Sequence, residues 1–261
     1  MLGGMPTTVA AVTGATRGIG RAIAVRLAEE GATVAVGGRD ASEGARTVEL
    51  IEQAGATGVY TRLDVTDADA VASWIHGTAS DHGGLHWLVN NAGMNGDAAR
   101  LEDYPVEAFE QVVRTNLMAA FYTTRAALRV MRPQGGGSIV NVGSTASLQG
   151  YGLLAAYTAS KHGLVGLTKS TALENADVPI RANIICPGPV DTPLMQSIER
   201  LVNPDDPTAA RAMFEGTTAL KRYGTPEEIA NLVHFLLSDR SGYITGTAIS
   251  VDGGVMTGVG T

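Results

Sequence analysis

Seven short apolar runs rich in β-branched residues recur along the chain, and the segments between them place apolar residues three and four positions apart. Short apolar runs of this kind predict buried strands, whereas the wider spacing predicts amphipathic helices. Strands that alternate with helices favour a parallel sheet covered on both faces. The predicted strands span residues 7–14, 33–38, 59–65, 85–93, 138–144, 181–188 and 247–254. We therefore expect an α/β fold with a doubly wound, parallel, seven-stranded sheet.

Two of the predicted helices are long and cover residues 105–131 and 155–175, and Pro105 suits the first turn of a helix. No Pro/Ser-rich linker, charge block or internal repeat divides the chain. Residues 1–261 are therefore predicted to form one domain.

Residues 191–217 fit the alternation of strands and helices least well. Pro193, Pro204 and Pro207 interrupt their helical segments, because proline ends a helix that precedes it. We interpret this segment as a lid over a site, with a plain surface excursion as the alternative.

The composition supports a compact α/β protein: 44% of the 261 residues are hydrophobic, 17% are charged and 33 are glycine. The net charge of −7 argues against a general affinity for nucleic acid or anionic membranes. Cys186, the single cysteine, has no partner for an internal disulfide. With no basic segment before the first apolar residues and no apolar stretch of membrane-spanning length, we expect a soluble, cytoplasmic protein.

Tyr157 and Lys161 lie four residues apart in a predicted helix and so share one of its faces. A cation beside a phenol favours the phenolate, so we expect Lys161 to lower the pKa of Tyr157 towards neutrality. The hydroxyl of Ser144, thirteen residues upstream of Tyr157, is suited to hold an oxygen that exchanges a proton with it. The three residues predict proton transfer to or from an alcohol oxygen.

Residues 13–20, TGATRGIG, follow the first predicted strand directly and open a helix. In that setting the glycines permit a tight turn, and the free amide groups at the start of the helix can hold a pyrophosphate. The loop therefore predicts a dinucleotide site on a Rossmann-type sheet.

The glycine spacing and the motifs that follow it occur in a characteristic order. Three residues separate Gly14 from Gly18, and one separates Gly18 from Gly20. NNAG at residues 90–93, Asn116, Ser144, Tyr157 with Lys161, and Pro187 with Gly188 come next. Over essentially its whole length the chain resembles the short-chain dehydrogenase/reductase family, in particular NADPH-dependent ketoreductases and 3-oxoacyl-carrier-protein reductases.

This resemblance implies a hydride transfer between a nicotinamide cofactor and a ketone or secondary alcohol. Tyr157 would then exchange a proton with the substrate oxygen, Ser144 would hold that oxygen, and Lys161 would bind the nicotinamide ribose and lower the tyrosine pKa. Asn116 would hold a water that links Lys161 to solvent. The cofactor-binding residues implied are Gly14, Thr16, Arg17, Gly18, Ile19, Gly20, Arg39, Asp64, Val65, Asn91, Ala92, Gly93, Tyr157, Lys161, Pro187, Gly188, Val190 and Thr192.

The end of the second strand bears on the choice between NAD and NADP. Gly38 occupies the position at which NAD-preferring relatives carry an acidic residue, Arg39 follows it, and Arg17 is expected to face the same place. Two guanidinium groups suit a phosphate, which favours NADP(H) and carbonyl reduction. Asp40 leaves NAD(H) as the less favoured cofactor.

The substrate side is expected to be largely apolar. The residues implied are Met94, Ser144, Gln149, Tyr151, Leu154, Tyr157 and Met195, which favour an apolar ketone. Carrier-protein docking would require basic residues at the ends of both long helices. Arg129 and Arg132 suit one end, but Val178 beside Asp177 occupies the other, which weakens a carrier-bound substrate.

Two other functions stay open: an NAD-linked alcohol or dihydrodiol dehydrogenase, and a non-catalytic dinucleotide-binding sensor or scaffold. Sensors of this kind usually lose the tyrosine or the lysine, and this chain retains both. His162 and His234 lack metal-ligand spacing, so no metal is assigned. Family members associate through the two long helices, so a homotetramer is expected.

Overall fold

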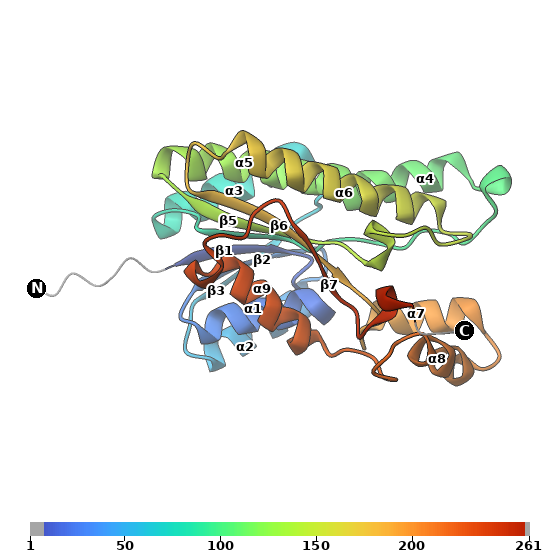
Figure 1. Cartoon of the computed structure of the whole chain (residues 1–261). Helices are drawn as coiled ribbons and strands as arrows, with labels where there is room; N and C mark the ends of the chain where they lie inside the picture. The colour runs from blue at the N-terminus through green and yellow to red at the C-terminus, as the bar shows by residue number, and fades with distance from the viewer. Residues whose placement is uncertain (1–7, 259–261) are drawn as a thin grey trace, which may run out of the picture.

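The structure, a computed structural model, describes residues 8–258, so Thr7 at the start of the first predicted strand lies outside the described residues. Its strands form one parallel sheet in the order β3-β2-β1-β4-β5-β6-β7 (Figure 1). They are β1 Val9–Thr13, β2 Thr33–Gly38, β3 Gly58–Arg62, β4 Trp87–Asn90, β5 Gly137–Val142, β6 Ile180–Pro187 and β7 Ala248–Val251. The predicted doubly wound, Rossmann-type sheet of seven strands is confirmed.

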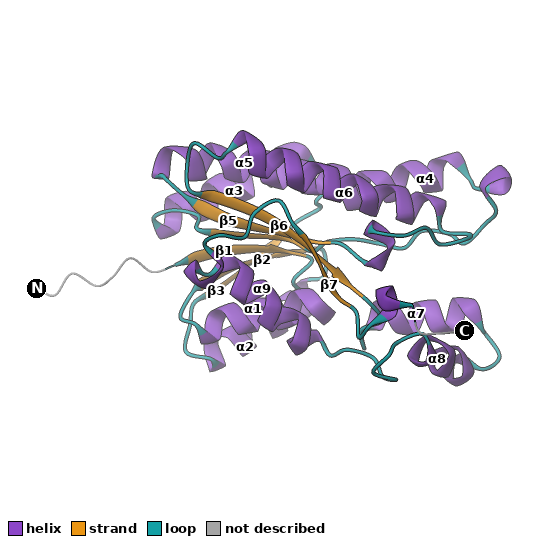
Figure 2. Cartoon of the chain, viewed as in Figure 1, coloured by secondary structure: helices purple, strands orange, loops and turns teal. Residues whose placement is uncertain are grey.

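Helices cover both faces of the sheet, as Figure 2 shows. They are α1 Gly18–Glu29, α2 Ala41–Gln53, α3 Ala68–His82, α4 Val106–Val113, α5 Ala119–Gln134, α6 Ala155–Glu174, α7 Pro193–Val202, α8 Pro207–Gly216 and α9 Pro226–Leu237. The shorter turns are η1 Leu101–Asp103, η2 Arg114–Met118, η3 Thr145–Ser147, η4 Asp239–Ser241 and η5 Val255–Thr257. One layer holds α3, α4, α5 and α6, and the other holds α1, α2 and α9.

Strands β1 and β2 are buried along their whole length, because helices cover both of their faces. Successive residues of β1 illustrate this: Val12 packs in the core beneath α1 and α9, whereas Ala11 packs in the core beneath α3 and α5. Each core is closed by fully buried helix residues, such as Leu27 of α1 and Met131 of α5.

The sheet order reverses its direction between β1 and β4, and the carboxyl ends of all the strands lie at one edge. In open α/β sheets a crevice forms at such a reversal, and ligands bind there. The loops that follow β1, β4, β5 and β6 meet at this edge, and α7 and α8 extend beyond it (Figure 1).

The first predicted long helix is not regular. It consists of α4, one π-helical turn (η2, Arg114–Met118) and α5, and it continues to Gln134. A π turn accommodates an extra residue and is frequently found at functional sites. The second long helix, α6, spans 155–174, close to the predicted range.

Residues 191–217 form two helices rather than an irregular loop. The side chains of Thr192 and Asp206 cap α7 and α8, and a proline occupies the first turn of each helix. Arg211 of α8 binds Asp191 at 3.0 Å and stacks over the ring of Tyr223, 4.4 Å from its centroid. These contacts tie α8 to the loop that follows β6.

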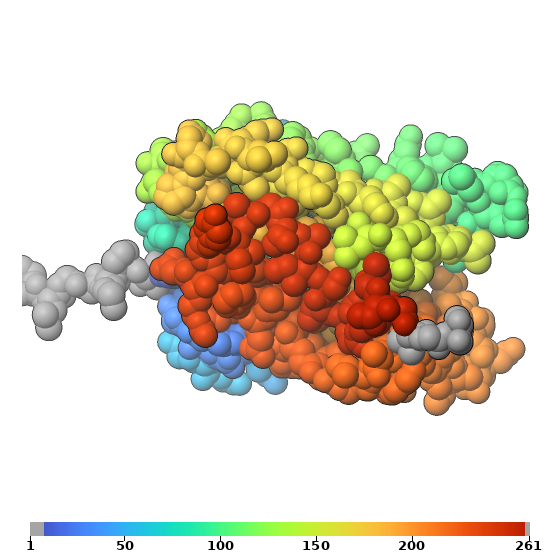
Figure 3. All heavy atoms as spheres, in the orientation of Figure 1, coloured from blue at the N-terminus to red at the C-terminus, as the bar shows by residue number. Residues whose placement is uncertain are grey.

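The space-filling view shows the C-terminal residues, in red, covering the middle of one face between α6, in yellow, and the segment of α7 and α8, in orange (Figure 3). Within residues 8–258, no helix is both long and apolar enough to cross a bilayer.

Candidate functional site

The glycine loop between β1 and α1 packs closely on the end of β4. A Cβ atom on Gly20 would overlap the carbonyl oxygen of Gly14, so only glycine lets α1 approach the loop this closely. Gly18 has a φ of +54°, and its Cα faces Thr192, which a Cβ would meet at 3.4 Å. The loop after β6 is thereby brought over the loop after β1.

Asn91 ties the glycine loop to β4. Its Nδ2 donates to the carbonyl oxygens of Thr13 at 3.1 Å and Gly14 at 3.0 Å. The hydroxyl of Thr13 in turn accepts from the backbone amides of Asn91 and Ala92 at 3.0 and 3.1 Å. The side chain of Asn91 therefore holds the glycine loop in place, because its amide nitrogen is hydrogen-bonded to backbone oxygens of that loop.

The start of α1 differs from that of most other helices in the structure. Its N-cap, Arg17, makes no capping hydrogen bond, and its first turn, which includes Ile19, holds no acidic residue. Side chains cap α2, α3, α7, α8 and α9. Uncapped amides at a helix N-terminus fit an anion, so these residues suit the pyrophosphate of a dinucleotide.

Gly38 at the end of β2 lies against Thr16 of the glycine loop. A Cβ on Gly38 would lie 2.5 Å from the Thr16 methyl carbon, so an acidic side chain there needs a rearrangement of the loop. Arg39 is exposed and makes no hydrogen bond or ion pair within the described residues.

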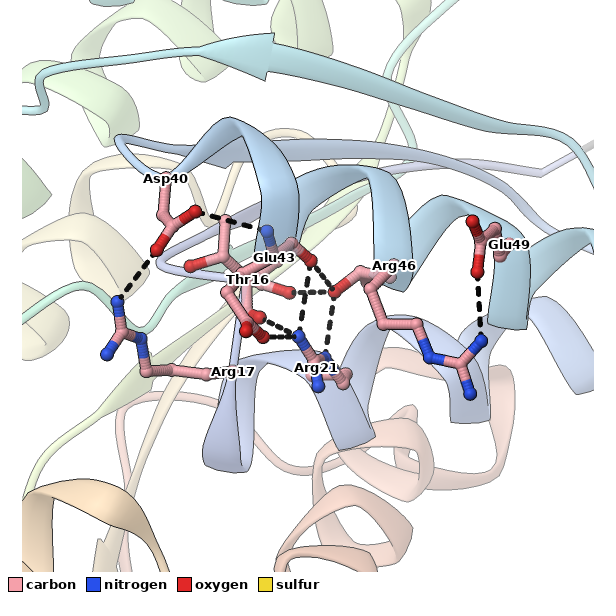
Figure 4. Close-up of polar contacts among 9 residues, drawn as sticks. Thr16, Arg17, Arg21, Asp40, Glu43, Arg46 and Glu49 are labelled. Carbon is pink, nitrogen blue, oxygen red and sulfur yellow. Dashed lines mark hydrogen bonds and ion pairs between the residues drawn. The ribbon is translucent and has the colours of Figure 1, made fainter.

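Asp40 is engaged, as Figure 4 shows. Its Oδ1 accepts from the amide of Glu43 at 3.1 Å and caps α2, and its Oδ2 lies 3.4 Å from Arg17. Arg21, which no sequence motif indicated, donates from Nε to Thr47 at 3.0 Å and also contacts Thr16 and Glu43. The guanidinium of Arg21 therefore links the glycine loop to α2.

A further group of predicted cofactor residues follows β3 at the same sheet edge. Asp64 accepts at Oδ1 from the amide and hydroxyl of Thr66 at 2.9 and 2.8 Å, and these bonds hold its pKa below the usual range. The neighbouring Val65 is buried. Asp64 thus has a local turn role, as is common for aspartate.

After β6, the chain turns at Pro187 and Gly188 and then pairs again with a distant segment. Val190 forms a parallel bridge with Gly224, and the hydroxyl of Thr192 caps α7 by accepting from the amide of Met195 at 3.2 Å. This pairing fixes Thr192 opposite the glycine loop.

Lys161 lies at the centre of the site and is only 5% exposed. Its Nζ donates to the carbonyl oxygen of Val142, the last residue of β5, at 2.8 Å and lies 5.6 Å from the ring centroid of Tyr157. Burial disfavours the charged amine and lowers the pKa of Lys161 to about 8.

Tyr157 differs from the expectation that Lys161 lowers its pKa. Burial is the largest effect and raises the pKa of Tyr157 above its ordinary value, while a hydrogen bond with Ser144 acts in the opposite direction. The amine of Lys161 is directed to the Val142 carbonyl, and desolvation of the phenol prevails. Tyr157 is therefore a protonated phenol at neutral pH, the form required of a proton donor.

Asn116 occupies the π turn and is buried. Its Oδ1 accepts from the amide of Met94 at 2.8 Å, and its Nδ2 donates to the Met94 carbonyl at 2.9 Å and to Ser160 Oγ at 3.0 Å. Ser160 donates to the carbonyl of Tyr157 at 2.8 Å, a link that the sequence analysis missed. A Cβ on Gly93 would lie 3.3 Å from Asn116 Oδ1 and 3.7 Å from Lys161 Nζ, so the segment after β4 borders both side chains.

The predicted substrate residues divide into two groups, of which the first follows β5. The hydroxyl of Tyr151 accepts from Gln149 Nε2 at 2.6 Å and bonds with Thr145 at 2.8 Å. These residues belong to the loop that leads to Leu154 at the start of α6.

The second group borders a cleft of about 260 Å³ between the segment after β4 and α7. The cleft is lined by Met94, Asn95, Gly96, Asp97, Leu194, Ser197, Ile198 and Leu201. Met94 lines the cleft, whereas Met195 does not. Leu194, the residue before Met195, faces the cleft from the first turn of α7 instead.

Comparison with known proteins is consistent with this geometry. A profile of the family described as Enoyl-(Acyl carrier protein) reductase matches residues 14–256. The 3beta-hydroxysteroid dehydrogenase of Mediterraneibacter gnavus is 38% identical over 270 aligned positions that cover 98% of each chain. The chain belongs to the short-chain dehydrogenase/reductase family.

Solved structures of this short-chain dehydrogenase/reductase family superpose closely on the chain. Levodione reductase does so with a TM-score of 0.94 at 34% identity, over 96% of this chain and 98% of that one. A variant of actinorhodin polyketide ketoreductase, solved with NADPH, gives a TM-score of 0.91 at 35% identity, over 95% and 97% of the two chains. The protein is thus an oxidoreductase of a family that acts on ketones and alcohols and binds a nicotinamide dinucleotide.

A buried polar network lies beneath the site of this short-chain dehydrogenase/reductase, and the sequence analysis missed it. Asn90 Nδ2 donates to Thr124 at 3.0 Å and to Asn141 Oδ1 at 2.8 Å. Asn141 Nδ2 donates to the hydroxyl of Thr168, two turns after Lys161 on α6, at 2.8 Å. The network joins β4, β5, α5 and α6 in the protein interior. Because water cannot replace a lost partner there, breaking any of these hydrogen bonds would destabilise the fold.

The Thr168→Val variant removes the hydroxyl but keeps the shape of the side chain. We expect it to lower the free energy of unfolding by about 1–3 kcal/mol, because Asn141 loses a buried hydrogen-bond partner. Urea denaturation measures this value. In the control, Thr171→Val, the lost hydroxyl bonds only a carbonyl of its own helix, so a change below about 0.5 kcal/mol is expected. Equal effects of the two variants would contradict the role of the network.

The low pKa of Lys161 predicts a pH dependence of stability. Below pH 8 the lysine is charged in both the folded and unfolded protein, so its burial cost is fully present. As the pH rises from about 8 to 10.5, the folded protein binds fewer protons than the unfolded protein, and stability rises. The free energy of unfolding of the unsubstituted protein minus that of Lys161→Met is expected to increase by about 3 kcal/mol over this range.

Urea denaturation at a series of pH values, without cofactor, measures this difference. Lys169→Met, at an exposed position of the same helix, serves as the control and should give a difference that does not change with pH. A difference for Lys161→Met that stays constant or falls above pH 8 would show that its charge carries no burial cost.

Proposed function

We propose that this short-chain dehydrogenase/reductase uses NADPH to reduce a largely apolar ketone to a secondary alcohol. The observation that carries the proposal is the position of Tyr157, a phenol whose pKa is raised by burial, with its ring centroid 5.6 Å from the buried amine of Lys161. The uncapped start of α1 and the glycine loop, which Asn91 holds by hydrogen bonds, support a dinucleotide site at the same sheet edge.

The reaction adds a hydride to the carbonyl carbon and a proton to the carbonyl oxygen. When bound, the reduced nicotinamide would supply the hydride. The hydroxyl of Tyr157 would give its proton to the oxygen, which the hydroxyl of Ser144 orients by a hydrogen bond. The tyrosinate that remains would be stabilised by the ammonium of Lys161, and the proton lost from the tyrosine would be restored from solvent. Asn116, which fixes the segment of Met94, would keep the wall of the site in place.

Arg39 and Arg17 support NADPH as the cofactor. Arg39 is exposed without a partner in the described part of the chain, and Arg17 has only a long contact with Asp40 at 3.4 Å. Gly38 itself supplies no carboxylate at the end of β2 to bind a free ribose hydroxyl or to repel a 2′-phosphate, and the nearby Asp40 is engaged as the N-cap of α2. The solved ketoreductase with NADPH, at 35% identity, is consistent with this choice.

The ends of α5 and α6 favour a free ketone over a carrier-bound one. Arg132 forms a two-point contact with Asp177, with Nη2–Oδ2 and Nη1–Oδ1 distances of 2.7 and 3.0 Å. The charge of Arg132 is thereby matched within the chain, which leaves less of it for an acidic carrier protein.

We further propose one domain for the chain, a lid formed by α7 and α8, and a homotetramer built on α4, α5 and α6.

The Tyr157→Phe variant tests the reaction. We expect kcat for a panel of cyclic ketones with NADPH to fall by about 10²-fold or more, because the proton donor is lost, while the Kd for NADPH stays within about threefold. Absorbance of NADPH and its fluorescence on binding measure the two quantities. Tyr243→Phe, at a fully exposed position, should retain full activity.

Substantial residual turnover by Tyr157→Phe would refute its role. No turnover of any ketone by the unsubstituted protein, despite tight binding of NADPH, would instead favour a sensor or scaffold. Faster oxidation of secondary alcohols with NAD would favour the NAD-linked dehydrogenase.

The Arg39→Asp variant tests the cofactor preference. We expect the ratio of kcat/KM with NADPH to kcat/KM with NADH to fall at least about tenfold, because a charged hydrogen bond to phosphate is replaced by repulsion. Steady-state kinetics with the two cofactors measures the ratio. Arg46→Asp makes the same charge change on α2, at a residue paired with Glu49, and should leave the ratio unchanged. An unchanged ratio in Arg39→Asp would refute the assignment.

A further inference from the structure

The 222–225 segment, which precedes α9, holds the loop that follows β6. Both backbone polar atoms of Gly224 bond to that loop: the amide donates to the carbonyl of Pro189 at 3.0 Å, and the carbonyl accepts from the amide of Asp191 at 3.0 Å. Thr192, which faces the glycine loop, follows directly. A displacement of the 222–225 segment would therefore displace Thr192 from the expected dinucleotide site.

One carboxylate of α9 closes the 222–225 segment from the other side. Glu228 accepts from both terminal nitrogens of Arg222, with Nη2–Oε1 and Nη1–Oε2 distances of 2.6 and 2.8 Å. Its Oε2 also accepts from the backbone amide of Thr225, the N-cap of α9, at 2.8 Å. A capping box needs only the bond to the N-cap amide. The two further bonds join the first residue of the segment to its last.

The pair of Arg222 and Glu228 differs from an ordinary surface ion pair. Its side chains are 51% and 44% exposed, and single pairs at such positions contribute little to stability. This pair has the parallel two-point geometry that fixes direction as well as distance. Arg222 also donates from Nη1 to the carbonyl of Tyr223 at 2.9 Å and from its amide to the hydroxyl of Thr218 at 3.2 Å. The pair is therefore the centre of a small network around the segment.

The charge of this network persists at every pH at which the protein is handled. The hydrogen bonds from Arg222 and from the Thr225 amide lower the pKa of Glu228 to about 2. The carboxylate therefore stays ionised and keeps all three of its bonds near neutral pH.

The pair does not touch the expected dinucleotide site. Within residues 8–258, the bonds of the Arg222 and Glu228 side chains reach only each other, the carbonyl of Tyr223 and the amide of Thr225. Neither of these two further residues is among those expected to bind the cofactor. An effect of the pair on dinucleotide binding must therefore pass through Gly224 and the loop that follows β6.

We propose that Arg222 and Glu228 are positioning residues for the dinucleotide site. They hold the 222–225 segment closed, and through the two backbone bonds of Gly224 they keep Thr192 opposite the glycine loop. The proposal rests on the proposed cofactor site, but it does not depend on which ketone is reduced.

Arg222→Gln and Glu228→Gln test the proposal, because each removes the two-point contact and keeps a side chain of similar length. We expect each to raise the Kd for NADPH about fivefold, the upper range for an exposed ion pair. At saturating NADPH, kcat should stay within about twofold, since the pair does not contact Ser144, Tyr157 or Lys161. Fluorescence of bound NADPH and steady-state kinetics measure the two quantities.

The double variant, Arg222→Gln with Glu228→Gln, tests whether the two residues act as one unit. Either single substitution already breaks the contact, so the double variant should bind NADPH about as weakly as each single variant. Arg222→Lys keeps the charge without the two-point geometry, and it is expected to recover part of the lost affinity.

The ion pair of Arg46 and Glu49 on α2 provides the matched control. Its side chains are 54% and 57% exposed, and its atoms lie 2.9 Å apart. Arg46→Gln and Glu49→Gln should leave the Kd for NADPH within about 1.5-fold. Thermal unfolding verifies that every variant is folded. A pair with a merely structural role would lower the Tm and leave the Kd unchanged.

Three results would overturn the proposal. An unchanged Kd in both single variants would show that the packing of the buried Tyr223 holds the segment by itself. Additive losses in the double variant, or an equal loss in the α2 control, would show that the pair does not act through its own contact. Binding of NADPH without turnover of any ketone would refute only the proposed function, because the Kd values still decide the role of the pair.

Discussion

One buried hydrogen bond governs the geometry of the candidate site, the bond from Lys161 Nζ to the carbonyl oxygen of Val142. An amine removed from water is unfavourable unless dipoles around it compensate, so the bond is costly to break. Because the acceptor is a backbone atom at the end of β5, the bond sets the position of α6 along that strand. Tyr157, one turn earlier on α6, is thereby held at the edge of the sheet, where Ser144 follows β5.

A second contact between the same two elements makes this position unique. Thr168, two turns after Lys161, accepts a hydrogen bond from Asn141, the residue before Val142. These two hydrogen bonds, two turns apart along α6, restrain both the translation and the rotation of the helix on the sheet. The link from Asn116 through Ser160 to the Tyr157 carbonyl joins the π turn to the same helix, so the walls of the site are held by one connected set of bonds.

The sequence predicts the fold well because its signals are local and repeated. All seven strands and the two long helices follow from apolar runs and helical spacing, and the glycine loop follows from its place between strand and helix. Three features differ from the prediction or escape it. The π turn at Asn116 has no distinct apolar pattern, the bond partners of Asn141 lie far apart in the sequence, and the pKa of Tyr157 is raised where the spacing predicts a lowered value.

The sequence by itself determined the order of the strands and helices, the glycine-loop motif and the presence of Ser144, Tyr157 and Lys161 at a characteristic spacing. These properties depend on residue type and on separation along the chain. Only the tertiary structure decided how far the side chains are buried, where the amine of Lys161 points and which face of α7 meets the cleft. Burial, pKa and the place of Leu194 and Leu201 in the wall of the cleft depend on contacts between distant segments, and spacing along the chain does not specify those contacts.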